Sequence, residues 1–128
     1  MKVAKAVGAG LIKQGFDVIY TRITDNYVNL GERCRIANTK KATLFVSIHA
    51  NSAQNAAANG IETLCYAKNS FAEITQKELV SALKLKDRGI KERRDLYVLN
   101  GTEMTAILVE LGFLSNINDA NVMRKNGF

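Results

Sequence analysis

Two short, nearly continuous apolar segments constrain the fold more than any other feature of this sequence. Residues 44–48 and 106–109 are dominated by aliphatic and β-branched side chains. Runs of this length and composition are typical of strands that are covered on both faces, as in a parallel sheet. Each run is followed directly by a titratable residue, His49 in one case and Glu110 in the other.

The remaining segments alternate between helical and extended patterns. Helical spacing of apolar residues is found at 3–12, 30–37 and 71–83, and residues after Asp119 are weakly helical. We expect the first helix to end at Gly15, which suits a left-handed position after a helix. Capping-box-like pairs begin the other two, at Asn29/Glu32 and Ser70/Glu73. Further strands are predicted at 16–20, 61–66 and 97–99, and residues 87–91 are predicted to form a charged loop.

This alternation predicts an α/β fold, with a single twisted, largely parallel sheet and helices on both faces. The 128 residues contain no linker or repeat, so we expect one domain over residues 1–128. A hydrophobic content of 47% with 23% charged residues excludes wholesale disorder. No apolar run is long enough to span a bilayer, so membrane insertion is not expected.

The net charge of +6 favours a polyanionic partner, either nucleic acid or an anionic cell-wall polymer. The basic residues are spread along the chain, however, and no zinc-finger, basic-zipper or RRM signature is present, so no nucleic acid is expected as partner. A basic nucleic-acid-binding domain therefore stays the weaker alternative. Cys34 and Cys65 are predicted to be buried free thiols, with a disulfide between them as the alternative. The first residues lack the apolar stretch of a signal peptide.

Ligand sites in open α/β sheets lie beyond the carboxyl ends of the strands, where this sequence places His49 and Glu110. If their strands are parallel neighbours, the two side chains project into one crevice. His49 is the only histidine; it is either a metal ligand or a hydrogen-bonded residue at a strand end. Glu110 is either a partly desolvated general acid–base or the partner of an arginine. Glu62 and Glu103 are competing carboxylates.

Other catalytic classes find less support. No glycine-rich dinucleotide or Walker-type phosphate loop is present, and no G-x-S-x-G nucleophile elbow. Ser47 and His49 are two residues apart on one strand and so point the same way, but no acidic partner completes a serine triad. Either cysteine could pair with His49 only if its thiol were accessible.

Several segments, taken in order, then match a known pattern. They are 30–38 (LGERCRIAN), 44–51 (LFVSIHAN), 60–63 (GIET), 87–91 (DRGIK) and 107–116 (ILVELGFLSN), followed by Asp119. Over roughly residues 15–120 the sequence resembles the zinc-dependent N-acetylmuramoyl-L-alanine amidases. These are cell-wall hydrolases of bacteria and of phage endolysins.

The resemblance implies a twisted α/β sheet and cleavage of the amide between N-acetylmuramic acid and L-alanine in peptidoglycan. In that family zinc polarises the carbonyl and activates a water while a glutamate moves the proton. His49 then corresponds to a zinc ligand and Glu110 to the catalytic glutamate. Asn51, Arg88 and Asn116 fall in motif positions near the cleft without an assigned role. A cell-wall or extracellular location is implied as well.

The sequence also departs from the family pattern. The family takes its other two zinc ligands, a histidine in a glycine-rich loop and a later glutamate, from segments upstream of those matched here. We therefore expect an incomplete zinc site in a partial catalytic domain that lacks the first strand. Its last helix, after Asp119, is expected to be cut short by the end of the sequence at residues 126–128. The chain would then be a fragment of a longer enzyme, an inactive homologue that binds peptidoglycan without cleaving it, or one half of a site that a partner completes.

Overall fold

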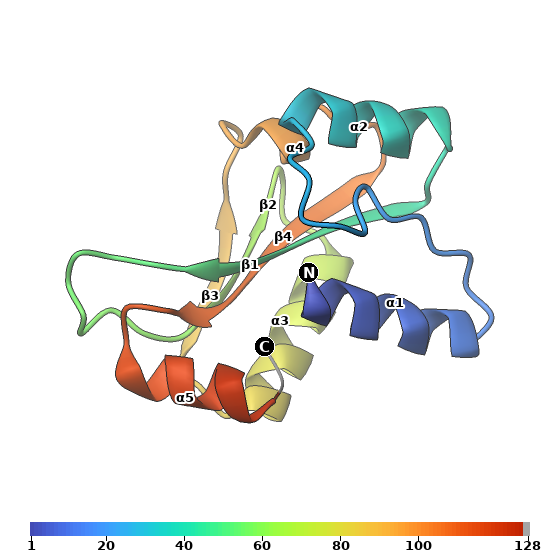
Figure 1. Ribbon diagram of the computed structural model, residues 1–128. Helices are drawn as coiled ribbons and strands as arrows, with labels where there is room; N and C mark the ends of the chain where they lie inside the picture. Colours follow the sequence, from blue (N-terminus) through green and yellow to red (C-terminus); the bar gives the residue numbers. More distant parts are fainter. Residues whose placement is uncertain (127–128) are drawn as a thin grey trace.

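The computed structural model describes residues 1–126 and has a four-stranded sheet flanked by helices (Figure 1). The order of strands across the sheet is β1-β4-β2-β3. β1 runs parallel to β4 and β2 parallel to β3, while β2 and β4 are antiparallel. The predicted α/β class with a largely parallel sheet is confirmed. The elements are α1 (Lys2–Lys13), α2 (Leu30–Thr39), β1 (Leu44–Asn51), β2 (Ile61–Cys65), α3 (Ser70–Leu83), β3 (Asp87–Glu92), α4 (Tyr97–Asn100), β4 (Thr105–Phe113) and α5 (Ile117–Lys125).

Helices cover both faces of the sheet, as Figure 1 shows with α2 and α4 on one side and α3 and α5 on the other. Side chains alternate between the faces along each strand. Leu108 of β4 packs with residues of α2 and α4, whereas Ile107 packs with Ala72 of α3 and Met123 of α5. The sheet therefore separates two apolar clusters, and the expected helices on both faces are confirmed.

Both cysteines are buried and free, as predicted, one in each apolar cluster: Cys34 under α4 and Cys65 against α3. Burial raises the pKa of both thiols. Among the described residues, no helix has both the length and the apolar composition needed to cross a membrane.

The predicted strand at residues 16–20 is wrong, because this segment has no regular structure. A strand requires a neighbouring strand for its backbone hydrogen bonds. β1 lies at the edge of the sheet, and within residues 1–126 its outer side pairs with nothing. The segment instead lies along α1, where the Tyr20 hydroxyl donates to the Lys5 carbonyl at 3.4 Å and its ring fills the space beside Gly8.

The prediction that residues 44–48 are covered on both faces is also wrong. Phe45 and Ser47 are buried toward α2 and α4, but Leu44 and Val46 on the opposite face are 47% and 43% exposed. The apolar side of α1 is similarly open, since only its first turn reaches the core through Val3. By contrast, the predicted end of α1 is confirmed, because Gly15 follows the helix with a φ of +87°.

Three local predictions near the other strands require correction. Residues 87–92 form strand β3 rather than a charged loop, because their backbone pairs with β2. The charged side chains have partners on neighbouring elements: Asp87 accepts from Gln76, and Arg88 contacts Glu62. Residues 97–100 form the one-turn helix α4 rather than a strand, since Val98 and Leu99 are both buried instead of alternating. The N-cap of α3 is Asn69 rather than Ser70, with its side chain accepting from the Ala72 N–H. The predicted cap Asn29 of α2 is confirmed.

A buried carboxylate joins the start of β2 to the end of β4. Asp119, at the start of α5, is 2% exposed. Its Oδ2 accepts a 2.7 Å hydrogen bond from the Gly60 N–H and a 2.9 Å hydrogen bond from the Phe113 N–H. Gly60 has a φ of +106°, and a Cβ there would lie 2.4 Å from the Lys86 carbonyl oxygen, so only glycine fits. The expectation of a shortened last helix involves residues 127–128, which lie outside the described residues.

We predict that Asp119→Ala lowers the free energy of unfolding by about 2–4 kcal/mol, because it leaves two buried N–H groups without an acceptor. Urea denaturation followed by circular dichroism measures the change. The control is Asn118→Ala, a change of a neighbouring exposed side chain, for which we expect less than about 0.5 kcal/mol. Equal losses for both variants would contradict a specific role for the Asp119 carboxylate.

Candidate active site

Pairing between strands places a row of titratable side chains across the sheet. In the parallel pair of β1 and β4, His49 is the register partner of Glu110. In the antiparallel pair of β2 and β4, Glu110 is the partner of Glu62. Because register partners point to the same face of a sheet, all three side chains lie on the side that carries α2 and α4. The sequence-based prediction that His49 and Glu110 lie on neighbouring parallel strands is confirmed.

Glu110 is half-buried and lacks a partner for one of its carboxylate oxygens. Its Oε2 is shielded from solvent, and no hydrogen-bond donor reaches it from residues 1–126. Desolvation, together with the negative charge of Glu62, raises its pKa to about 7. Within the described part of the chain it forms no ion pair with an arginine, the alternative that the sequence left open. At neutral pH its carboxyl group can therefore hold or release a proton.

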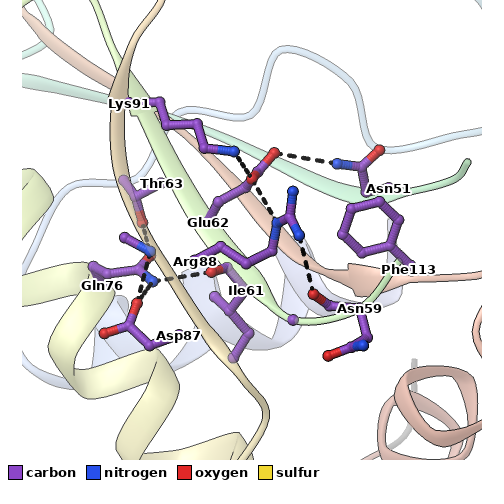
Figure 2. Close-up of polar contacts among 12 residues, drawn as sticks. Asn51, Asn59, Ile61, Glu62, Thr63, Gln76, Asp87, Arg88, Lys91 and Phe113 are labelled. Atoms are coloured by element: carbon purple, nitrogen blue, oxygen red, sulfur yellow. Dashed lines mark hydrogen bonds and ion pairs between the residues drawn. The ribbon is translucent and has the colours of Figure 1, made fainter. Parts of the chain in front are cut away.

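Glu62 attracts the cations that Glu110 lacks. Figure 2 shows its carboxylate between Arg88 and Lys91 of β3, with Arg88 Nε at 2.8 Å and Lys91 Nζ at 2.5 Å from Oε2. Asn51 Nδ2 donates to Oε1 at 3.3 Å. Burial by itself favours a higher pKa for Glu62, but the hydrogen bonds and charges of Lys91 and Arg88 outweigh it and lower the pKa. Two adjacent carboxylates therefore have opposite tendencies: Glu62 stays ionised and Glu110 accepts a proton.

His49 has one ring nitrogen engaged within its own strand. Ser47 Oγ lies 3.0 Å from His49 Nε2, in agreement with their expected common face. Partial desolvation and the positive charges of Arg33 and Arg22 lower the pKa of His49. The neutral imidazole that this favours is the form that binds metals.

The residues present do not complete a zinc site. A catalytic zinc normally has three protein ligands and one open position. No group of three or more His, Cys, Asp or Glu side chains within residues 1–126 is arranged to hold a metal. His49 and Glu110 offer at most two donors, and the nearby Arg33 and Arg22 add positive charge that opposes a cation.

A groove beside His49 does not hold both predicted residues. It has a volume of about 410 Å³ and lies between the start of α1 and α5. Ile48 and Leu111, which belong to the face opposite the polar row, line it together with His49, but Glu110 does not. The predicted common crevice is therefore realised as adjacent positions on one sheet face, and not as this groove.

The other residues in motif positions are placed as follows. Asn51 and Arg88 contact Glu62 directly. Asn116 caps α5 and donates to the Ala56 carbonyl, which is a supporting role. Glu103 is exposed and precedes β4, at the opposite end from Glu110, so it is not a competing carboxylate. Sequence reasoning missed the cluster around Glu62; the signal that could have revealed it is the presence of two cations, three residues apart, in the segment that forms β3.

Comparison with known proteins identifies the family. The model of the N-acetylmuramoyl-L-alanine amidase family matches residues 1–128. This chain belongs to the N-acetylmuramoyl-L-alanine amidase family. The resemblance inferred from the ordered motifs is thereby confirmed, and with it the assignment to an enzyme family.

Three relatives illustrate the relationship of this amidase-family chain. The crystal structure of N-acetylmuramoyl-L-alanine amidase from Clostridium difficile 630 is 35% identical, with a TM-score of 0.89 over 97% of this chain and 70% of that one. The N-acetylmuramoyl-L-alanine amidase LytC of Bacillus subtilis is 34% identical over 98% of this chain and 26% of its own length. The uncharacterised Bacillus subtilis protein YqiI is 39% identical over 94% of this chain and 61% of its own. This chain thus spans less than two thirds of the length of the two Bacillus subtilis relatives.

We predict that Glu110→Gln stabilises the metal-free chain at pH 8 but not at pH 4.5. A carboxyl group whose folded pKa is raised from 4.5 to about 7 contributes stability below pH 4.5 that is lost as the pH rises through 7. Gln cannot ionise, so it removes the cost of burying a charged carboxylate at pH 8. Allowing for solvent screening, we expect the free energy of unfolding to rise by on the order of 1 kcal/mol at that pH.

Thermal and urea unfolding in the presence of a chelator measure this difference at both pH values. Glu103→Gln is the matched control, since that side chain is exposed. Its effect on the free energy of unfolding should be small and the same at pH 4.5 and pH 8. The buried, protonatable state of Glu110 is contradicted if Glu110→Gln has the same effect at both pH values.

Proposed function

We propose that this chain forms the carboxylate-bearing part of a peptidoglycan amidase site, in which Glu110 moves the proton during hydrolysis of the amide between N-acetylmuramic acid and L-alanine. The observation that carries this proposal is the placement of Glu110 beside His49 in the β1–β4 register, with Oε2 buried and unpartnered within residues 1–126. A buried oxygen without a partner is costly unless a substrate or a proton satisfies it.

The chemistry of amide cleavage supports this role. The amine leaving group is a poor one unless it gains a proton as the bond to carbon breaks. A carboxyl group with a pKa of about 7 can take a proton from the attacking water and give it to that nitrogen. Glu62, held ionised by two cations, cannot perform the same transfer at neutral pH, so it leaves Glu110 as the proton carrier.

We further propose that His49 is one ligand of the zinc on which the family typically depends. Because residues 1–126 offer no three-donor group, the other ligands would come from outside this sequence, and no reaction step is assigned to the metal here. Proteins named as cell wall amidases are among the relatives, such as the probable cell wall amidase LytH of Staphylococcus saprophyticus at 32% identity. We therefore place the activity at the cell wall.

The incomplete donor set favours a second candidate function. A domain with this sheet face but without a complete metal site would bind peptidoglycan without cleaving it. The net charge of +6 would favour such binding to anionic wall polymers, as a non-specific attraction.

Zinc content and cleavage of purified peptidoglycan distinguish the two candidates. Both are measured for the 128-residue chain and for the same chain extended upstream by a strand and loop carrying a histidine and a glutamate. The amidase proposal predicts about one tightly bound zinc per chain and release of N-terminal L-alanine for the extended form only. If the extended form binds the wall but neither holds zinc nor releases L-alanine, the binding-module candidate stands instead.

We predict that, in the extended form, Glu110→Gln lowers kcat by roughly a hundred- to ten-thousand-fold while the zinc content is kept, because it removes the proton carrier but no ligand. His49→Ala should lose zinc and activity together. Glu103→Gln serves as the control and should retain both. Full activity of the Glu110→Gln variant would refute the assigned role.

A further inference from the structure

The polar row does not end at Glu62, because two cations of β3 extend it across the sheet. Arg88 and Lys91 both contact the Glu62 carboxylate (Figure 2), and Glu62 itself is 7% exposed. The order across the face is therefore His49, Glu110, Glu62 and then the pair Arg88 and Lys91. We refer to Arg88, Lys91 and Glu62 as the cationic cluster.

The cationic cluster carries a net positive charge, because its two cations share a single carboxylate partner, Glu62. Two cations face one carboxylate, and the Lys91 side chain is 44% exposed. Arg88 uses Nε for Glu62 and Nη1 for the Asn59 carbonyl, while its Nη2 has no hydrogen-bond partner among residues 1–126. Donors thus remain on both cations for an anion that arrives from solvent.

Arg88 is also held in a fixed orientation. Its guanidinium group lies over the ring of Phe113, 5.0 Å from the centroid, and its side chain is 27% exposed. With Nε held by Glu62, the preorganised guanidinium presents its unpartnered Nη2 to an arriving carboxylate as a charge-assisted donor. Lys91 adds a mobile charge beside it.

The spacing fits a peptide that runs from Glu110 toward β3. Neighbouring strands lie about 4.8 Å apart, and the cations of β3 reach back to Glu62, the register partner of Glu110. An anion bound to them therefore lies one to two strand spacings, roughly 5–10 Å, from the backbone of Glu110. An extended peptide advances about 3.3–3.6 Å per residue, so this distance corresponds to two or three residues. A substrate with its scissile amide at Glu110 would then bring its second or third peptide residue to the cations.

We propose that Arg88 and Lys91, positioned by Glu62, form a subsite for a free carboxylate on the second or third residue of the stem peptide. This inference rests on the proposed function, since it assigns a substrate feature to the same sheet face. The subsite selects acidic stems over stems in which that carboxylate is an amide, because an amide lacks the charge that the cluster attracts.

Binding of two probes to the 128-residue chain tests the subsite without requiring catalysis. The probes are N-acetylmuramoyl-L-alanyl-D-glutamate and its α-amide, N-acetylmuramoyl-L-alanyl-D-isoglutamine, both capped at the γ-carboxyl as the methylamide so that they differ only in the free α-carboxylate. Each is titrated by calorimetry at low salt. We expect the acid to bind about tenfold more tightly than the amide. Lys91→Met should reduce the affinity for the acid about three- to tenfold and leave that for the amide unchanged.

Lys77→Met is the matched control, because Lys77 is an exposed lysine of α3, on the opposite face; it should alter neither affinity. Lys91→Met leaves the Arg88–Glu62 pair in place, and thermal unfolding checks that it folds. Equal affinities for acid and amide, or a loss at Lys91→Met shared by both probes, would overturn the subsite while leaving the proposed function intact. If neither probe bound the chain, the subsite would be overturned together with the assignment to muramoyl peptides, even if zinc were bound.

Discussion

The structure depends on β4, which pairs with a parallel neighbour on one edge and an antiparallel neighbour on the other. Parallel pairing with β1 requires the two carboxyl ends to meet, and antiparallel pairing with β2 brings the start of that strand to the same place. Residues from three separate parts of the sequence therefore converge on Glu110. Loss of either pairing would remove one neighbour of that carboxylate, and with it either the imidazole or the second carboxylate.

The two adjacent carboxylates on this face have different chemistry because their neighbours differ. Glu62 is the more buried of the two and yet remains ionised, because β3 supplies two cations within hydrogen-bond distance. Glu110 has no such partner and feels the negative charge of Glu62. Two carboxyl groups whose surroundings push their pKa values apart are a common arrangement for acid–base catalysis. The cationic cluster therefore serves Glu110 indirectly, by keeping its neighbour charged.

The sequence predicts the α/β class, both strands that carry His49 and Glu110, and the proximity of these residues, because short apolar runs and helix caps are local signals. Its errors have physical reasons. Residues 16–20 alternate like a strand, but alternation does not provide a neighbour for their backbone. The charged residues at 87–91 predict a loop, because the sequence alone does not show that Arg88 and Lys91 bind Glu62. That carboxylate is 26 and 29 positions away from them in the sequence. Long-range contacts of this kind leave no local trace in a single sequence.

The outer edge of β1 affects how the isolated chain behaves in concentrated solution. Within the part of the chain that the structure describes, the N–H and C=O groups along this edge have no strand to pair with, and Leu44 and Val46 lie exposed next to them. Such an edge can template sheet formation between molecules. Mutual repulsion between chains of net charge +6, reinforced by Lys40 and Lys41 just before the strand, opposes that encounter. Colloidal stability is therefore tied to ionic strength: salt that screens the charge removes the main barrier to fibrous or amorphous precipitation.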